Sequence, residues 1–291
     1  MADIVVPPYW MRLAAEDLCG TVMVIGAPDT GKSTLAVHLY QSLCRRGRRT
    51  AYLDADVGQS ILGLPTTLNV ALAQEPGDPS FPPQGARAAF FVGAVTPRGH
   101  MLPTVIGSYR LQQKAFELGA EVIVLDTTGL VDSSHGGKAL KQWKIELLTP
   151  GVVIGLQQGR ELEPILWPLR RDGRVRCVEL SVSSHVAVRS REARIARRRE
   201  GLARYFRGAR PHRVVLQQMA VYDLERLASS ALLAFQDGEG LVLGLGVVEE
   251  IVQPAATIVV RTPLADLEGV MSVRFGAARW DLLGQREIRV L

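Results

Sequence analysis

The sequence contains few cysteines and no long apolar run. Its three cysteines, Cys19, Cys44 and Cys177, are far apart in a chain of 291 residues, and no Cys-x-x-Cys occurs. This spacing argues against a disulfide framework and a thiolate zinc site, and it fits a reducing compartment. No apolar stretch approaches the roughly 20 residues that span a bilayer, and residues 1–9 lack the regions of a secretion signal. We expect a cytoplasmic protein without a membrane partner.

The overall composition is that of a globular protein. Hydrophobic residues make up 47% of the chain and charged residues 22%, which excludes disordered, collagen-like and coiled-coil classes. There is no internal repeat. At roughly 100–200 residues per domain, the chain holds one large domain or a main domain with a smaller one.

Short apolar runs alternate with helical patterns over the first two thirds of the chain. The expected strands are Thr21–Ile25, Thr50–Leu53, Ala89–Val92, Glu121–Leu125, Val152–Leu156 and Val175–Leu180. The expected helices are Thr34–Arg46, Leu111–Leu118 and Lys138–Leu148. Alternation of this kind predicts an α/β fold with a mainly parallel sheet covered by helices on both faces.

The last eighty or so residues follow another pattern. Leu232–Phe235, Leu241–Val248, Ala256–Val260 and Val270–Phe275 are short candidate strands separated by Gly, Pro and Asp. We expect a small C-terminal β-rich domain here. The boundary is predicted near Pro211, with domains at 1–210 and 211–291.

One motif determines the class of ligand. Residues 26–33 (GAPDTGKS) match G-x-x-x-x-G-K-[ST] between an expected strand and an expected helix, which predicts a P-loop. The glycines let the backbone wrap a phosphate, Lys32 reaches the β and γ oxygens, and the Ser33 hydroxyl binds Mg²⁺. A nucleoside triphosphate is the expected ligand. Because no Asn/Thr-Lys-x-Asp motif is present to read guanine, we favour ATP.

Acidic residues follow two of the expected strands. Asp54 and Asp56 end the Thr50–Leu53 strand, and Asp126 ends the Glu121–Leu125 strand. Ligands bind at this edge of a parallel sheet, so Asp54 or Asp56 is a candidate base for an attacking hydroxyl. Asp54 and Asp126 are candidate Mg²⁺ ligands together with Ser33. The alternative is that the Asp-x-Asp pair caps a turn or helix.

Arginine is concentrated between Arg189 and Arg213, where ten arginines accompany two acids. Ile195, Leu202 and Phe206 lie at helical spacing, which predicts a helix over Arg189–Arg207 with a narrow apolar stripe. A solvated surface helix is one interpretation, and contact with a polyanion is the other.

Four segments together resemble the RNA 5′-hydroxyl polynucleotide kinase family, which includes kinases of tRNA splicing, pre-mRNA 3′-end cleavage and pre-rRNA processing. The segments are Gly26–Thr34 (GAPDTGKST), Leu53–Gln59 (LDADVGQ), Phe91–Pro103 (FVGAVTPRGHMLP) and Asp126–Val131 (DTTGLV). They occur in the family's order within residues 15–210. The resemblance implies a P-loop NTPase fold that uses ATP and Mg²⁺ and acts on nucleic acid with a 5′-hydroxyl end.

The resemblance also implies a set of functional residues. ATP would bind at Gly26, Asp29, Thr30, Gly31, Lys32, Ser33 and Thr34. Thr127, Thr128, Gly129 and Leu130 would form the clasp beside the terminal nucleotide, with Gln59, Thr96, Arg98 and His100 as further substrate contacts. The arginine-rich segment, about residues 185–207, would be the lid, in which Arg191, Arg194 or Arg198 contacts the transferred phosphoryl group and others bind the substrate backbone.

These observations predict a polynucleotide 5′-hydroxyl kinase whose catalytic residues are Lys32, Asp54, Asp56, Arg194 and Arg198. Two alternatives stay open. One is a P-loop ATPase switch that works by exchanging partners. The other is a nucleic-acid-binding scaffold that holds ATP without transferring phosphate.

Overall fold

The computed structural model describes residues 7–252, 256–282 and 284–288, which form two compact units. The first unit contains the described residues up to Asp56, together with Leu68–Ala88 and Pro97–Arg189. The second unit contains Val57–Thr67, Ala89–Thr96 and the described residues from Ser190 onward. Pro211, where we expected a boundary, lies inside a strand of the second unit.

The first unit is built on a mixed, mainly parallel sheet. Its strands are β1 (Gly20–Gly26), β2 (Thr50–Ala55), β3 (Thr67–Leu72), β4 (Arg87–Phe91), β5 (Val122–Thr127), β6 (Val152–Gln157) and β7 (Arg176–Ser181). They lie in the order β4-β3-β2-β5-β1-β6-β7. The pairs β2/β5, β5/β1, β1/β6 and β6/β7 are parallel, whereas β2 and β3 are antiparallel. Every residue of β5 is buried, as expected for a strand covered on both faces.

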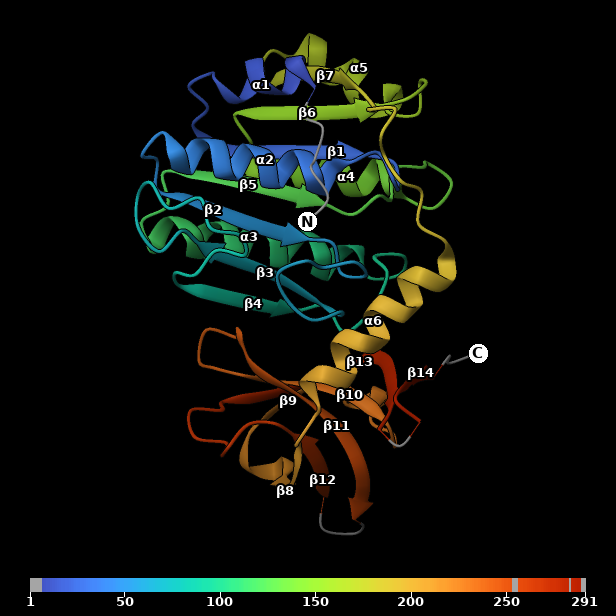
Figure 1. Cartoon of the computed structure of the whole chain (residues 1–291). Coiled ribbons are helices and arrows are strands. Elements are labelled where there is room, and N and C mark those ends of the chain that lie inside the picture. The colour runs from blue at the N-terminus through green and yellow to red at the C-terminus, as the bar shows by residue number, and fades with distance from the viewer. Residues whose placement is uncertain (1–6, 253–255, 283, 289–291) are drawn as a thin grey trace. The chain divides into compact units, whose positions relative to one another are not determined.

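Helices cover both faces of this sheet, so the predicted α/β architecture is confirmed. They are α1 (Pro8–Ala14), α2 (Lys32–Arg45), α3 (Met101–Glu117), α4 (Gly137–Leu148) and α5 (Glu163–Asp172). Figure 1 shows α2 in front of the sheet and α3 and α4 behind it. Strands β1, β2 and β5 are neighbours and run parallel, so their carboxyl ends lie at one edge of the sheet. The residues of the candidate site lie at this edge and in the loops that leave it.

The second unit contains a mostly antiparallel sheet in the order β14-β13-β10-β11-β12-β8, with β9 beside β13. Its strands are β8 (Arg210–Val215), β9 (Ala220–Tyr222), β10 (Ala231–Gln236), β11 (Val242–Val252), β12 (Thr257–Thr262), β13 (Ser272–Asp281) and β14 (Arg286–Ile288). Short 3₁₀ turns, η1 (Leu216–Gln218) and η2 (Leu224–Arg226), connect three of them. The predicted C-terminal β-rich sheet is present.

The arginine-rich segment forms helix α6 (Arg191–Tyr205) of the second unit. Ser190 caps it, since the Ser190 hydroxyl accepts a hydrogen bond from the Ala193 amide at 3.1 Å. Leu202 and Phe206 are buried in a cluster with Phe91, Leu232, Ala234, Leu245, Val247 and Trp280. The predicted helix is confirmed, and Leu202 and Phe206 of the predicted stripe pack on the β-sheet of the same unit, whereas Ile195 is half-buried and lies outside this cluster.

Three elements of the first unit were not predicted, and one was predicted too short. No strand was predicted at β3 and no helix at α1 or α5. Helix α3 begins at Met101, ten residues before the predicted start at Leu111. Pro164 and Pro168 interrupt the pattern of α5, whose buried residues still follow one face. No helix in the described parts of the chain is long and apolar enough to cross a membrane.

Candidate active site

The loop between β1 and α2 has the geometry of a phosphate-binding loop. Asp29 and Gly31 adopt positive φ angles of 56° and 86°, and α2 begins directly after Gly31. This turn brings backbone N–H groups and the helix N-terminus to one concave side, which favours an anion. The Lys32 ammonium is buried and donates hydrogen bonds to the Ala27 carbonyl at 2.5 Å and to Thr30 Oγ1 at 3.5 Å.

Two glycines of the loop are required by their surroundings. A Cβ at Gly26 would stand 2.7 Å from the Leu156 carbonyl oxygen and 2.7 Å from Thr30 Oγ1. Gly31 has a left-handed backbone in which other residues are strained. The two glycines of the sequence motif therefore serve the close packing of the loop and its turn.

The acidic residues at the carboxyl ends of β2 and β5 meet at one edge of the sheet, as predicted. Asp54 and Asp126 are register partners in the parallel β2/β5 pair, and both are 1% exposed. Paired residues on parallel neighbours project to the same face of a sheet, at the interstrand spacing of about 5 Å. Asp56 is half-buried, and its amide donates to Asp54 Oδ1 at 3.2 Å.

The environment of Asp126 favours its protonated form. Burial, followed by the nearby charge of Asp54, raises the pKa of Asp126 to about 7, although the Ser33 hydroxyl and the Lys32 ammonium oppose the shift. Asp126 Oδ2 accepts a hydrogen bond from the Tyr52 hydroxyl at 3.1 Å. Burial also raises the pKa of Tyr52 well above its usual range, so Tyr52 is a permanent donor at this position.

The same edge fits a divalent cation. Asp126 Oδ1 is buried and has no hydrogen-bond partner among the described residues. Ser33, Asp54 and Asp126 present hydroxyl and carboxylate oxygens, the donor type that Mg²⁺ prefers. These three residues, predicted as metal ligands from the sequence, all belong to the first unit.

Two lysines that sequence reasoning missed lie beneath this edge. Lys141 and Lys144 lie one turn apart on α4, and both are 0% exposed. Lys141 Nζ donates to Thr127 Oγ1 at 2.7 Å and to the Thr128 carbonyl at 2.5 Å. Lys144 Nζ is buried without a hydrogen-bond partner among the described residues. In the sequence, only their positions could have shown this, because both lysines lie among the buried apolar residues of α4.

Burial dominates the titration of both lysines. It lowers the pKa of Lys144 to about 7, while the charges of Asp56, Asp126 and Asp54 act in the opposite direction. Burial and the neighbouring Lys144 and Lys32 ammonium groups lower the pKa of Lys141 well below its usual range. The edge thus gathers carboxylates and amines whose charges depend on one another.

The predicted clasp lies against the phosphate-binding loop. A Cβ at Gly129 would stand 2.8 Å from the Pro28 nitrogen and 2.9 Å from the Pro28 Cα. Thr127 and Thr128 are buried, and Leu130 is half-buried. The structure therefore brings Gly129 of this turn into contact with the P-loop, and its role beside the acceptor stays a prediction.

Other predicted substrate residues are distributed over both units. Arg98 is exposed, and its Nη2 lies 3.8 Å from Asp132 Oδ2. His100 precedes α3, and its carbonyl accepts a hydrogen bond from the Thr104 hydroxyl at 2.7 Å. Thr96 is exposed and belongs to the second unit. Arg98 and His100 belong to the first unit with the P-loop, whereas Thr96 does not.

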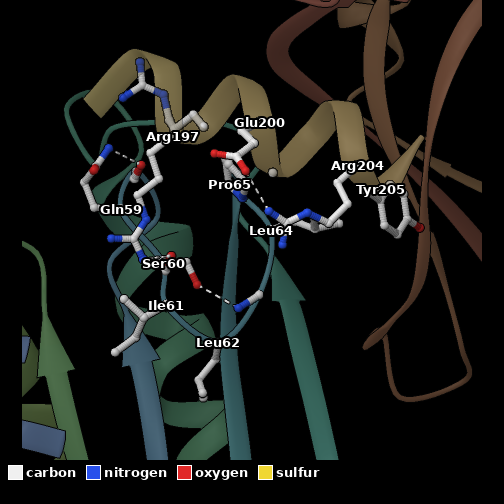
Figure 2. A pocket seen from close by; sticks show the side chains of 14 residues that line it. Gln59, Ser60, Ile61, Leu62, Leu64, Pro65, Arg197, Glu200, Arg204 and Tyr205 are labelled. Atoms are coloured by element: carbon white, nitrogen blue, oxygen red, sulfur yellow. Dashed lines mark hydrogen bonds and ion pairs between the residues drawn. The ribbon is translucent and has the colours of Figure 1, made fainter. Parts of the chain in front are cut away.

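Gln59 lies in an open cavity of about 560 Å³ within the second unit. The loop Gly58–Pro65 forms one wall and α6 forms the other (Figure 2). Gln59 Nε2 donates to the Arg194 carbonyl at 3.2 Å, and Arg197 Nη2 donates to the Ser60 carbonyl at 3.3 Å. Arg204 and Glu200 form an exposed ion pair on the α6 side. The cavity thus has an arginine-bearing wall opposite the segment that follows Asp56.

The predicted lid arginines all belong to the second unit. Arg191 is exposed at the first position of α6, and Arg194 is half-buried. Arg198 forms a bidentate pair with Glu287 of β14, with Nε–Oε1 and Nη2–Oε2 distances of 2.5 and 3.0 Å. The Arg198 side chain is 14% exposed. A role at the transferred phosphoryl group stays a prediction, and for Arg198 it requires release from Glu287.

Comparisons with known proteins agree on the family. Residues 26–208 match the family described as mRNA cleavage and polyadenylation factor CLP1 P-loop. The polyribonucleotide 5′-hydroxyl-kinase of Pyrococcus abyssi is 28% identical over 316 residues, covering 89% of this chain and 87% of the relative. The protein of that name in Methanocaldococcus jannaschii is 30% identical over 200 residues, covering 69% of this chain and 54% of the relative.

A solved structure supports the fold. Clp1p, in the wild-type complex of Clp1p with residues 454–563 of Pcf11p, aligns with a TM-score of 0.68 over 93% of this chain and 79% of Clp1p. The identity is 13%, so the likeness concerns the fold alone.

Proposed function

Because the chain belongs to the CLP1 P-loop family, we propose that it is a polynucleotide 5′-hydroxyl kinase that transfers the γ-phosphate of ATP to the 5′-hydroxyl end of RNA or DNA. One observation carries the proposal: the P-loop, the paired Asp54 and Asp126, and the turn at residues 127–130 converge at a single sheet edge. This convergence supports a site that takes triphosphate, metal and acceptor side by side. The names of the archaeal relatives support the same activity.

The residues of this edge divide the work between donor and acceptor. Gly26, Asp29, Thr30, Gly31, Lys32, Ser33 and Thr34 bind the triphosphate, and Ser33, Asp54 and Asp126 hold Mg²⁺. Bound Mg²⁺ neutralises charge on the phosphate oxygens during transfer. The Lys32 ammonium, which donates to the Ala27 carbonyl in this structure, would contact the β and γ phosphate oxygens when the triphosphate is bound.

The acceptor hydroxyl requires a base that it can reach. Asp54 is buried beside Asp126, whereas Asp56 is half-buried two residues further along the chain. We therefore assign Asp54 to the metal side and Asp56 to the proton of the attacking hydroxyl. Within the first unit, Arg98, His100, Thr127, Thr128, Gly129 and Leu130 contact the acceptor strand. The roles of Gln59, Thr96 and Arg191 at the acceptor, and of Arg194 and Arg198 at the phosphoryl group, are predictions that substitution of these second-unit residues tests.

The decisive experiment offers the protein γ-labelled ATP and 5′-hydroxyl oligonucleotides. Labelled oligonucleotide supports the kinase, release of free phosphate alone supports an ATPase switch, and tight ATP binding with neither supports a scaffold. RNA and DNA acceptors, single- and double-stranded, define the substrate class. Pre-phosphorylated 5′ ends are the matched control, because they leave no hydroxyl for attack.

The base assignment is tested by two substitutions. Asp56→Asn should lower kcat by a factor on the order of 10² or more, with Mg²⁺ dependence unchanged. Asp54→Asn should instead raise the Mg²⁺ concentration needed for half-maximal rate. The reverse pattern would exchange the two roles.

We place this activity in the cytoplasm. The three cysteines are free thiols, with Cys44 buried, Cys177 half-buried and Cys19 exposed. Free thiols suit a reducing compartment, where an ATP-dependent enzyme also meets its nucleotide.

A further inference from the structure

A fully buried amine supports the turn on which the acceptor end depends. Lys141 extends from α4 to the end of β5, where its Nζ donates to Thr127 Oγ1 at 2.7 Å and to the Thr128 carbonyl at 2.5 Å. The Thr127 hydroxyl in turn donates to the Val24 carbonyl of β1 at 2.7 Å. Lys141 therefore connects the helix to the last strand residue and to the first peptide beyond it.

The same turn is held from the other side by the P-loop. Gly129 is so close to Pro28 that a Cβ would fall within 2.9 Å of its backbone nitrogen. Beyond the turn, the Gly137 amide donates to the Asp132 carbonyl at 2.7 Å, which closes the loop where α4 begins. The path from Lys141 through Thr128 to Gly129 thus ends at the loop that wraps the triphosphate.

Packing does not explain a lysine at this position. An ammonium group loses its hydration on burial and is costly unless it is paired and hydrogen-bonded. Lys144 and Lys32 add repulsion, which Asp56 and Asp126 offset. A methionine would fill similar space without these costs. What methionine lacks is the N–H groups that hold Thr127 and Thr128.

We propose that Lys141 is a positioning residue that fixes the turn at residues 127–130 against the P-loop and so aligns the 5′-hydroxyl end for attack. The inference rests on the proposed kinase function. The Lys141 side chain is fully buried, and it acts through the Thr128 carbonyl and the Thr127 hydroxyl. Two hydrogen bonds from one amine in a dry site are strong enough to hold such a turn.

The test compares Lys141→Met with Lys138→Met, a control on the same helix. Lys138 is half-buried and does not take part in this bridge. Lys141→Met should raise the KM for the 5′-hydroxyl oligonucleotide at least fivefold, with the dissociation constant for ATP changed by less than twofold. Amide hydrogen exchange in residues 127–130 should accelerate at least tenfold in Lys141→Met and stay unchanged in Lys138→Met.

A second variant covers the case in which Lys141→Met does not fold. Thr127→Val keeps the shape of the side chain but removes the hydroxyl that links Lys141 to Val24. It should raise the oligonucleotide KM and accelerate amide exchange in residues 128–130 in the same way. Where Lys141→Met folds, the double variant should show less than the product of the two single effects.

The outcomes separate this inference from the kinase proposal. An active wild-type enzyme with unchanged oligonucleotide KM and unchanged exchange in the variants overturns the role of Lys141. A wild-type protein that transfers no phosphate overturns the kinase function instead, and the exchange measurement then still decides whether Lys141 holds the turn.

Discussion

The two sheets of the molecule differ in what they bury. In the first unit, Lys32, Asp54, Asp126, Lys141 and Lys144 are all buried at or below one sheet edge. In the described part of the second unit, the buried polar residues are neutral, namely Thr66, Thr67, Gln236, Thr257, Thr262 and Ser272. Buried charge costs free energy that an apolar core avoids. Burial of ionisable side chains therefore distinguishes the first unit, at the sheet edge that carries the P-loop, from the described part of the second unit.

The largest expected effect on phosphate transfer comes from removing the Lys32 ammonium of the P-loop. Lys32→Ala should lower phosphate transfer by a factor on the order of 10²–10³, because a preorganised donor at developing charge contributes about this much to the rate. Single-turnover transfer of γ-label measures the effect. Lys114→Ala, which removes a half-buried lysine paired with Glu117 on α3, is the matched control. Retained transfer in Lys32→Ala would contradict the assigned site.

The free-energy cost of burying a charge can be measured at Asp126, through the pH dependence of unfolding. Its pKa is raised from 3.8 to about 7 in the folded protein, so folding takes up a proton between these values and stability falls as pH rises from about 4 to 7. Asp126→Asn removes this loss. Relative to wild type, the variant should gain stability with increasing pH, by up to about 1.4 kcal/mol per pH unit within that window. Urea unfolding without metal or nucleotide measures the gain.

Asp132 provides the control of opposite sign. Hydrogen bonds from Ser134, and then His135, lower the pKa of Asp132 to about 2. The stability that Asp132 contributes is present above about pH 4 and is lost as pH falls toward 2, so Asp132→Asn should leave the pH 4–7 slope unchanged. An identical slope in wild type and Asp126→Asn would contradict the burial argument.

Arginines of α6 test whether the second unit takes part in the chemistry. Arg194→Ala and Arg198→Ala should each lower turnover at least about tenfold with folding unchanged, because a phosphate-contacting arginine contributes far more than a surface one. Glu287→Gln breaks the Arg198 pair but keeps the guanidinium, and it should retain turnover. Near-normal rates for both arginine variants would confine the chemistry to the first unit.

The smallest expected effect concerns the cavity between Gly58–Pro65 and α6. Arg204 is 70% exposed and paired with Glu200, so Arg204→Ala should change stability by less than about 0.5 kcal/mol. If the cavity borders the acceptor strand, oligonucleotide affinity should fall about threefold and its salt dependence should weaken by about one unit of slope. Arg174→Ala, an equally exposed arginine of the first unit, should change neither.

The sequence predicted the parts of the fold whose signals are local. Runs such as Thr21–Ile25 identified buried strands because β-branched residues cluster there, and the glycine spacing identified the P-loop. Strand β3 (TLNVAL) was missed because Asn69 and the preceding turn residues weaken its pattern. Helices α1 and α5 were missed because prolines stand in or before them.

The residues of the candidate site also fall into those that a local sequence pattern predicts and those that only tertiary packing reveals. Lys32, Ser33 and the acids at strand ends could be predicted because motif and strand order bring them together. Lys141 and Lys144 could not, since a lysine on a helix is normally assigned to solvent. Only the tertiary packing of α4 shows that both side chains are 0% exposed.

The way the chain divides between its units has a consequence for protein engineering. Because Val57–Thr67 and Ala89–Thr96 belong to the second unit, the polypeptide passes from one body to the other five times. Cutting after residue 210 would strip Phe91 and Leu202 of the sheet they pack on. Gene fusion or recombination at a single junction therefore cannot exchange the β-rich body for another. The two units therefore have to be transferred together.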